Sequence, residues 1–268
     1  MNRAVVFDAF NRQVRQSTRP DGTGALTEAD GPVVRRVPPS GAYGAGVVWS
    51  ELTAGDADQV ISSQLRFFAG RGQKFEWKLY SYDEPADLAD RLAAAGLIPA
   101  AAEALMVAEV AALGSATRDV VLPDGVRLEE VTDEAGLDRA MAVSAGAFGH
   151  RDPGLHAELR ELLESSPGLV TVIVAMAGHL PVCAGRIEFT PGAPFAGLWG
   201  GGTLPHWRRR GLYRALVAHR ARLAAARGYQ YLQVDASPQS EPILERLGFT
   251  KLAQTTPYTW SPVTARNK

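Results

Sequence analysis

The sequence is poor in cysteine, with Cys183 alone among 268 residues. A single cysteine excludes an intramolecular disulfide, which is typical of proteins from a reducing compartment. We therefore expect a cytoplasmic location. Because Cys183 lies in an apolar run, a core position is favoured over a role as nucleophile.

An excess of either charge is also absent, because 28 Lys and Arg against 29 Asp and Glu give a net charge of −1. Such a chain has no overall basic field to attract nucleic acid or an anionic membrane surface. No apolar run approaches the roughly 20 residues that a membrane-spanning helix needs. The five histidines show no metal-ligand spacing, and no Gly-x-Ser-x-Gly motif occurs. We expect no metal, no nucleic-acid partner and no membrane partner.

The most distinctive segment that is present runs from 199 to 216 and reads WGGGTLPHWRRRGLYRAL. Three glycines are expected to end a strand at 195–200, and a helix with an apolar stripe is expected from 212 to about 227. Free N–H groups at a helix N-terminus, flanked by arginines, predict a phosphate site. The alternative is that the arginines form a solvated surface or a nucleic-acid contact.

The chain is expected to have two halves, 1–115 and 124–262, separated by the polar stretch 114–125. Both halves contain an aromatic-rich strand, a short helix and another strand in the same order, which indicates a weak internal duplication. The predicted fold class is α/β, with a mixed, mostly antiparallel sheet flanked by helices. The expected strands are 47–52, 74–82, 105–110, 126–131, 169–175, 182–189, 195–200, 230–234 and 258–260, and the expected helices are 56–69, 85–95, 134–148, 155–163 and 241–247.

Arg208-x-x-Gly211-x-Tyr213 resembles the R/Q-x-x-G-x-G/A pyrophosphate loop of the GNAT superfamily of acetyl-CoA-dependent acyltransferases, with Tyr213 in place of the usual small residue. The resemblance extends over roughly 124–262 and includes the Leu-Gly-Phe at 247–249. It implies that acetyl-CoA binds here and that Ser237 stands where the family commonly has an asparagine. The implied cofactor-binding residues are Gly202, Thr203, Leu204, Arg208, Arg209, Arg210, Gly211, Leu212, Tyr213, Arg214 and Ser237. The first half lacks an R-x-x-G loop, so it is expected to be a structural lobe without a cofactor site.

The resemblance also implies that pantetheine pairs with the strand that ends at the three glycines. The carboxylate that many family members place on this strand is absent from 195–198, which leaves Glu188 and Asp235 as candidate bases. The family's usual tyrosine acid is replaced by Leu244. Protonation of the leaving thiolate is therefore assigned to Tyr213, Tyr231 or solvent.

The function implied is transfer of an acetyl group from acetyl-CoA to an amine of a small molecule or peptide. The missing strand carboxylate and tyrosine are also consistent with a non-catalytic acyl-CoA-binding sensor. A nucleic-acid-binding module that uses the arginines of 208–227 is the third hypothesis. Two tandem lobes are compatible with a monomer, and a homodimer stays open.

Overall fold

The computed structural model describes residues 1–20, 22–39, 42, 44–117 and 120–262, and its chain divides into two compact units. Unit 1 contains Met1–Val6 and Ala104–Leu252. Unit 2 contains Phe7–Glu103 and the chain from Ala253 onward. Residues 118 and 119, inside the expected boundary, lie outside the described residues.

Unit 1 is built on a sheet in the order β6-β11-β10-β9-β8-β7. Every neighbouring pair is antiparallel except β10 and β11, which run parallel. The strands are β6 (Glu103–Glu109), β7 (Val126–Glu130), β8 (Val170–Ala177), β9 (Leu180–Phe189), β10 (Phe195–Thr203) and β11 (Tyr231–Ala236).

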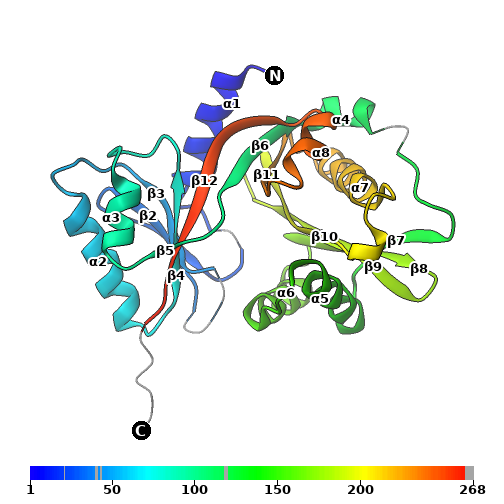
Figure 1. Ribbon diagram of the computed structural model, residues 1–268, viewed down its shortest axis with the longest axis horizontal. Helices are drawn as coiled ribbons and strands as arrows, with labels where there is room; N and C mark the ends of the chain where they lie inside the picture. The colour runs from blue at the N-terminus through cyan, green and yellow to red at the C-terminus, as the bar shows by residue number, and fades with distance from the viewer. Residues whose placement is uncertain (21, 40–41, 43, 118–119, 263–268) are drawn as a thin grey trace, which may run out of the picture. The chain divides into compact units, whose positions relative to one another are not determined.

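Helices cover both faces of this sheet, with α5 and α6 on one face and α7 and α8 on the other (Figure 1). Leu216 and Leu244 of the α7 and α8 face pack in one core cluster with Ile187. Leu137 and Leu159 of the opposite face pack in a second cluster. Because β8 is buried on both faces, its sequence VTVIVAMA is almost continuously apolar. The helices are α4 (Val110–Ala116), α5 (Glu134–Phe148), α6 (Pro153–Ser165), α7 (Leu212–Ala226) and α8 (Glu241–Arg246), with the 3₁₀ turn η2 (Pro205–Trp207) before α7.

Local sequence sets where α5 and α6 begin and end. The Asp133 side chain accepts a hydrogen bond from Gly136 N at the start of α5, and Gly149 ends that helix with φ +83°. Asp152 caps α6 in the same way, and Pro153 takes its first turn. These capping residues place the C-terminal end of α5 at Phe148, beside β10.

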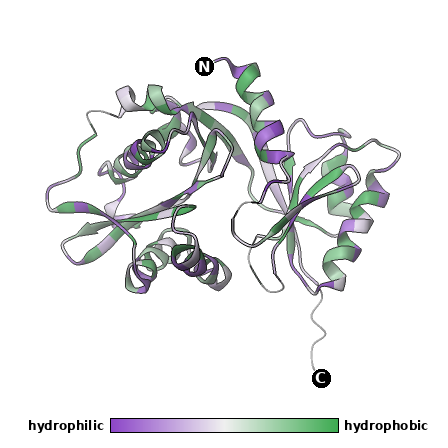
Figure 2. Cartoon of the chain, turned by 180° about the vertical axis from the view of Figure 1, so that it is seen from behind, coloured by the Kyte–Doolittle hydropathy of each residue, from purple (hydrophilic) through white to green (hydrophobic). Residues whose placement is uncertain are grey.

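Unit 2 has a smaller sheet in the order β1-β2-β3-β4-β12, with β5 also paired to β12. Its core includes Phe68 and Phe75, whose rings stack with centroids 4.3 Å apart, together with Trp77. In Figure 2 the strands of both units are mostly green, whereas the helices carry both green and purple along their length. The remaining elements, which lie wholly or partly in unit 2, are β1 (Leu26–Asp30), β2 (Val33–Val37), β3 (Gly46–Ser50), β4 (Phe75–Tyr80), β5 (Ile98–Pro99), β12 (Thr250–Trp260), α1 (Arg3–Phe10), the π-helix η1 (Asn11–Arg15), α2 (Ala57–Gly70) and α3 (Leu88–Ala94), of which α1 and β12 begin in unit 1.

Each unit contains the same motif, in which a strand is followed by a helix and then by a strand that runs parallel to the first. It is β10-α7-β11 in unit 1 and β3-α2-β4 in unit 2. The compact units also exchange strands relative to the halves expected from the sequence. Strand β6 of the first half pairs with β11, and β12 of the second half pairs with β4. The elements that sequence reasoning did not predict are α1, η1, β1, β2, β5, α4 and the 3₁₀ turn η2.

Candidate functional site

The parallel strands β10 and β11 separate part-way along their length. Their pairing covers Phe195–Gly197 of β10 opposite Tyr231–Gln233 of β11. In the described chain, β10 beyond Gly197 pairs with β9 and no longer with β11. The carboxyl ends of the two strands therefore diverge, and backbone groups on the β11 side of β10 become available to a ligand.

The three glycines lie inside β10 and do not end it, which corrects the sequence expectation, because the strand continues to Thr203. The register against β9 shifts between Trp199 and Gly202, so Gly200 and Gly201 form a bulge. A Cβ on Gly201 would lie 2.8 Å from Cε2 of Tyr213, and a Cβ on Gly202 would lie 3.0 Å from Cε2 of Phe148. Glycine is needed here because aromatic rings approach the strand from both faces.

The loop between β10 and α7 contains two residues with a left-handed backbone. Arg209 has φ +63°, the only positive φ on a non-glycine residue in the described chain, and Gly211 has φ +80°. Alternation of left-handed and right-handed conformations makes successive N–H groups converge into an anion-binding nest. Gly211 is also the N-cap of α7 and has no side chain to cap the helix. The amides of Leu212, Tyr213 and Arg214 begin the helix at this point.

The arginines of this loop have different tasks. Arg208 Nε donates to Thr203 O at 3.2 Å, and its Nη2 donates to Ala147 O at 3.3 Å, so this side chain ties the loop to β10 and α5. The Arg210 guanidinium lies 4.5 Å from the centroid of the Trp207 ring. Arg209 and Arg214 are exposed to solvent.

Both candidate bases lie on the sheet face opposite α7. Strand neighbours of Glu188 and Asp235, namely Ile187 and Val234, belong to the cluster on the α7 face, and side chains alternate along a strand. Glu188 Oε1 accepts a hydrogen bond from Arg186 Nε at 2.6 Å. Asp235 is half-buried on the diverging part of β11.

Tyr213 lies on the other face, where α7 packs. Ser240 lies near enough to lower the pKa of Tyr213, and its Oγ is 3.2 Å from Oγ of Ser237. Burial raises the pKa of Tyr213, and the nearby Arg220 acts against that rise. The alternative acid, Tyr231, stacks on Phe195 with centroids 4.9 Å apart, at the end of β11 where the strands are still paired.

The remaining predicted cofactor residues surround the same loop. Leu212, the first residue of α7, is buried, and Leu204 packs against the cluster beneath α5. Thr203 Oγ1 donates to Cys183 Sγ at 3.2 Å, and Cys183 is fully buried. Four residues at the site were missed by sequence reasoning: Phe148, Arg186, Arg220 and Ser240. An arginine in an otherwise apolar helix stripe was the available signal for Arg220.

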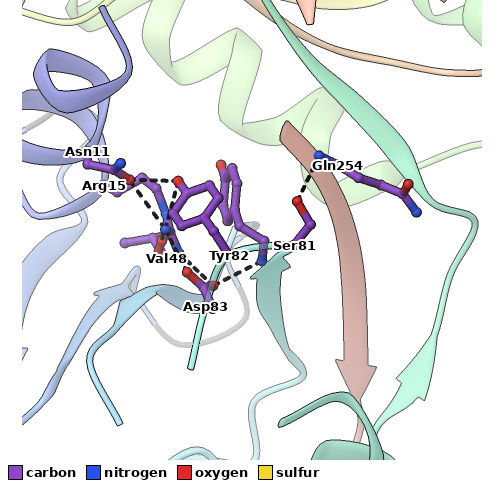
Figure 3. Close-up of polar contacts among 8 residues, drawn as sticks. Asn11, Arg15, Val48, Ser81, Tyr82, Asp83 and Gln254 are labelled. Atoms are coloured by element: carbon purple, nitrogen blue, oxygen red, sulfur yellow. Dashed lines mark hydrogen bonds and ion pairs between the residues drawn. The ribbon is translucent and has the colours of Figure 1, made fainter. Parts of the chain in front are cut away.

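The equivalent opening in unit 2 is filled by an arginine. Strands β3 and β4 pair at Gly46 and Val47, and Arg15 Nε then donates to Val48 O at 3.1 Å. Arg15 also forms an ion pair of 2.9 Å with Asp83, and both side chains are at most 3% exposed (Figure 3). Its guanidinium lies 3.8 Å from the centroid of the Tyr80 ring. The strand edge that is available in unit 1 is thus already bonded in unit 2.

No protein-family model and no curated protein matches the chain. Solved structures do match over nearly its whole length. A GCN5-related N-acetyltransferase from Kribbella flavida is 18% identical, with a TM-score of 0.64 over 98% of this chain and 96% of that one. A tandem GNAT protein from the clavulanic acid biosynthesis pathway, solved without acetyl-CoA, is 13% identical, with a TM-score of 0.59 over 97% and 94%. This chain has the GNAT fold.

A protein of unknown function from Staphylococcus epidermidis matches as well, at 14% identity and a TM-score of 0.66 over 89% of this chain and 95% of that one. These structural matches show that the chain has the mixed α/β fold of GNAT proteins, with a mostly antiparallel sheet. In the described part of the chain, no helix is long and apolar enough to cross a membrane. The same residues hold no group of three His, Cys, Asp or Glu side chains that could bind a metal ion.

Proposed function

We propose that unit 1 is an acyltransferase that moves an acetyl group from acetyl-CoA to an amine of a small molecule or peptide. The observation that carries the proposal is the divergence of β10 and β11 directly beside the amide nest at the start of α7. An extended amide chain fits the unpaired edge of β10, and a pyrophosphate fits a helix N-terminus. Acetyl-CoA carries both groups in one molecule.

The proposed cofactor contacts follow from this placement. Backbone amides of Gly211, Leu212, Tyr213 and Arg214 bind the pyrophosphate, with Arg209 and Arg214 supplying charge at the surface. Gly202, Thr203 and Leu204 face the pantetheine chain, and Ser237 lies across the opening from them. Arg208 and Arg210 hold the loop in shape through their bonds to Ala147 O and the Trp207 ring.

The chemistry is divided between the two faces of the sheet. Attack by the amine requires loss of its proton, and Glu188 and Asp235 lie on the α5 face as candidate bases. Glu188 is already paired with Arg186, whereas Asp235 lies on the strand that borders the opening. We therefore favour Asp235 as base and assign Glu188 to holding Arg186. Backbone N–H groups of the β10 bulge are suited to stabilise the oxyanion.

Unit 2 is proposed to bind no acetyl-CoA, because Arg15 occupies the edge of β3 and this unit has no arginine-rich loop before α2. A cytoplasmic location and a monomeric or homodimeric state stay predictions from the sequence.

Binding is tested by the melting temperature at millimolar CoA, since a ligand of the folded state raises it. Turnover is tested by release of CoA thiol from acetyl-CoA with a panel of amines. A thermal shift with thiol release supports the acyltransferase, and the absence of binding by calorimetry would overturn it.

A non-catalytic acyl-CoA sensor is the second candidate, favoured by the engagement of Glu188 with Arg186, and it would bind acetyl-CoA without releasing thiol with any amine.

A further inference from the structure

Arg220 is a fully buried arginine on α7, with 1% of its surface exposed. Its Nε donates to Leu216 O at 3.2 Å, and its Nη1 donates to Arg186 O at 3.0 Å. Both acceptors are neutral carbonyl oxygens. Its Nη2 is buried and has no hydrogen-bond partner among the described residues. A buried cation held in this way is costly to the fold, so its position calls for a function.

Arg220 and Tyr213 come together at Gly201. A Cβ built on Gly201 would lie 3.5 Å from Arg220 Nη2 and 2.8 Å from Cε2 of Tyr213. The two side chains are seven residues apart on α7, which places them on one face of the helix, two turns apart. That face is directed at the β10 bulge, where the strands diverge.

The hydroxyl of Tyr213 leads to a pair of serines. Ser240 lies near enough to this hydroxyl to lower its pKa, and Ser240 Oγ lies 3.2 Å from Ser237 Oγ. Ser237 follows directly on the end of β11, at the open end of the divergence. Both serines are partly exposed. A proton therefore has a short hydroxyl path between Tyr213 and solvent.

We propose that Tyr213 protonates the departing CoA sulfur and that Arg220 is the positioning residue that makes this transfer possible. This inference rests on the proposed acyltransferase function. The carbon–sulfur bond of the tetrahedral intermediate breaks and its electron pair leaves on sulfur. The hydroxyl proton of Tyr213 moves to that sulfur to give CoA thiol. A proton from solvent then returns to the phenolate through Ser237 and Ser240. The proton that the amine loses goes to solvent, so the protons balance over the reaction.

Charges around Tyr213 agree with this role. Arg220 on α7 and Cys183 on β9 act electrostatically on the tyrosine, and Arg186 of β9, whose backbone oxygen accepts from Arg220, adds a second positive charge near that arginine. Burial raises the pKa of Tyr213, whereas the positive charge of Arg220 lowers it. Loss of Arg220 should remove the larger of the two influences that oppose burial, the other being Ser240, and make Tyr213 a weaker acid.

The test compares Tyr213→Phe, Arg220→Met and Arg220→Lys with Arg222→Met, which removes an exposed arginine from the same helix. Tyrosine labelled with ¹³C at Cζ reports the titration of Tyr213 by NMR between pH 8 and 11.5, assigned from the Tyr213→Phe spectrum. Calorimetry reports acetyl-CoA binding, and thiol release with the best amine reports turnover. Circular dichroism and thermal melts report folding.

We expect Arg220→Met to raise the Tyr213 pKa further and to lower thiol release about tenfold. Arg220→Lys should recover most of both effects, and Tyr213→Phe should lower thiol release about 10²-fold with acetyl-CoA affinity unchanged. Arg222→Met should match the wild type in every readout. If Arg220→Met does not fold, Arg220→Lys and Tyr213→Phe carry the test.

Thiol release by Tyr213→Phe at the wild-type rate would overturn the inference and leave the acyltransferase function intact. The same holds if the Tyr213 titration is identical in the folded Arg220 variants and the wild type. If the wild type does not bind acetyl-CoA, the proposed function fails instead, whatever the titration shows.

Discussion

Tyr213 lies so close to Gly201 that a side chain at position 201 has no room, since a Cβ there would be 2.8 Å from the Tyr213 ring. A backbone carbon of β10 and an aromatic ring of α7 are thus in direct contact across the site. The contact fixes where the Tyr213 hydroxyl lies relative to the divergence of β10 and β11.

We expect Gly201→Ala to lower the free energy of unfolding by about 1–3 kcal/mol, because the added methyl group forces the Tyr213 ring to move. Chemical denaturation measures the change. Gly70→Ala is the control, since nothing lies within 4 Å of that position and its backbone is helical. In the double variant with Tyr213→Ala, most of the added cost of the alanine should disappear. Equal costs in both backgrounds would contradict the contact.

Gly211→Glu should abolish CoA binding without unfolding the protein. The new carboxylate would stand among the amides at the start of α7 and repel a pyrophosphate. Gly211→Ala shares the strain of a side chain at φ +80° but adds no charge, so it separates the two effects. Calorimetry should detect CoA binding by Gly211→Ala, at wild-type or reduced affinity. It should detect no CoA binding by Gly211→Glu. CoA affinity equal to wild type in Gly211→Glu would place the ligand elsewhere.

One CoA molecule should bind per chain. In unit 2 the backbone oxygen of Val48 is bonded to Arg15, so the strand edge is closed to an amide chain. The stoichiometry from calorimetry should be close to one, and Gly211→Glu should reduce it to zero. A value near two, or one remaining site in Gly211→Glu, would mean that unit 2 binds CoA.

The buried network at Arg15 should make stability depend on alkaline pH. Burial raises the pKa of Tyr82 to about 12, against 10.0 when unperturbed. Between pH 10 and 12 the unfolded state loses this proton and the folded state keeps it, so stability is complete below pH 10 and falls as the pH rises. A shift of this size corresponds to about 2–3 kcal/mol across the window.

Tyr82→Phe tests this pH dependence. At pH 7 the variant should be about 1–2 kcal/mol less stable, because the hydroxyl bonds to Asn11 and Arg15 are lost. The difference from wild type should shrink between pH 10 and 12 and reverse its sign toward pH 12, because the loss in wild type exceeds the cost of the substitution, as measured by denaturant unfolding at each pH. A difference that stays constant over that window would show that Tyr82 titrates normally in the folded protein.

The sequence by itself determined the local elements and the loop chemistry of the site. The helix expected at 134–148 has those same bounds in α5, and the arginine loop does lead into α7 at Leu212. Such features depend on neighbours a few residues apart, through apolar periodicity, capping and glycine conformation. The five-residue strands β1 (LTEAD) and β2 (VVRRV) are too short to show a clear apolar periodicity, and they were missed.

Only the tertiary structure decided which strands pair and what fills each opening. Strand β6 lies in the first half of the sequence but completes the sheet of unit 1, and β12 completes that of unit 2. Arg15 meets Asp83 across 68 residues, and Arg220 meets Tyr213 over Gly201. These contacts follow from packing between distant segments, because burial and shape select partners that no local pattern encodes.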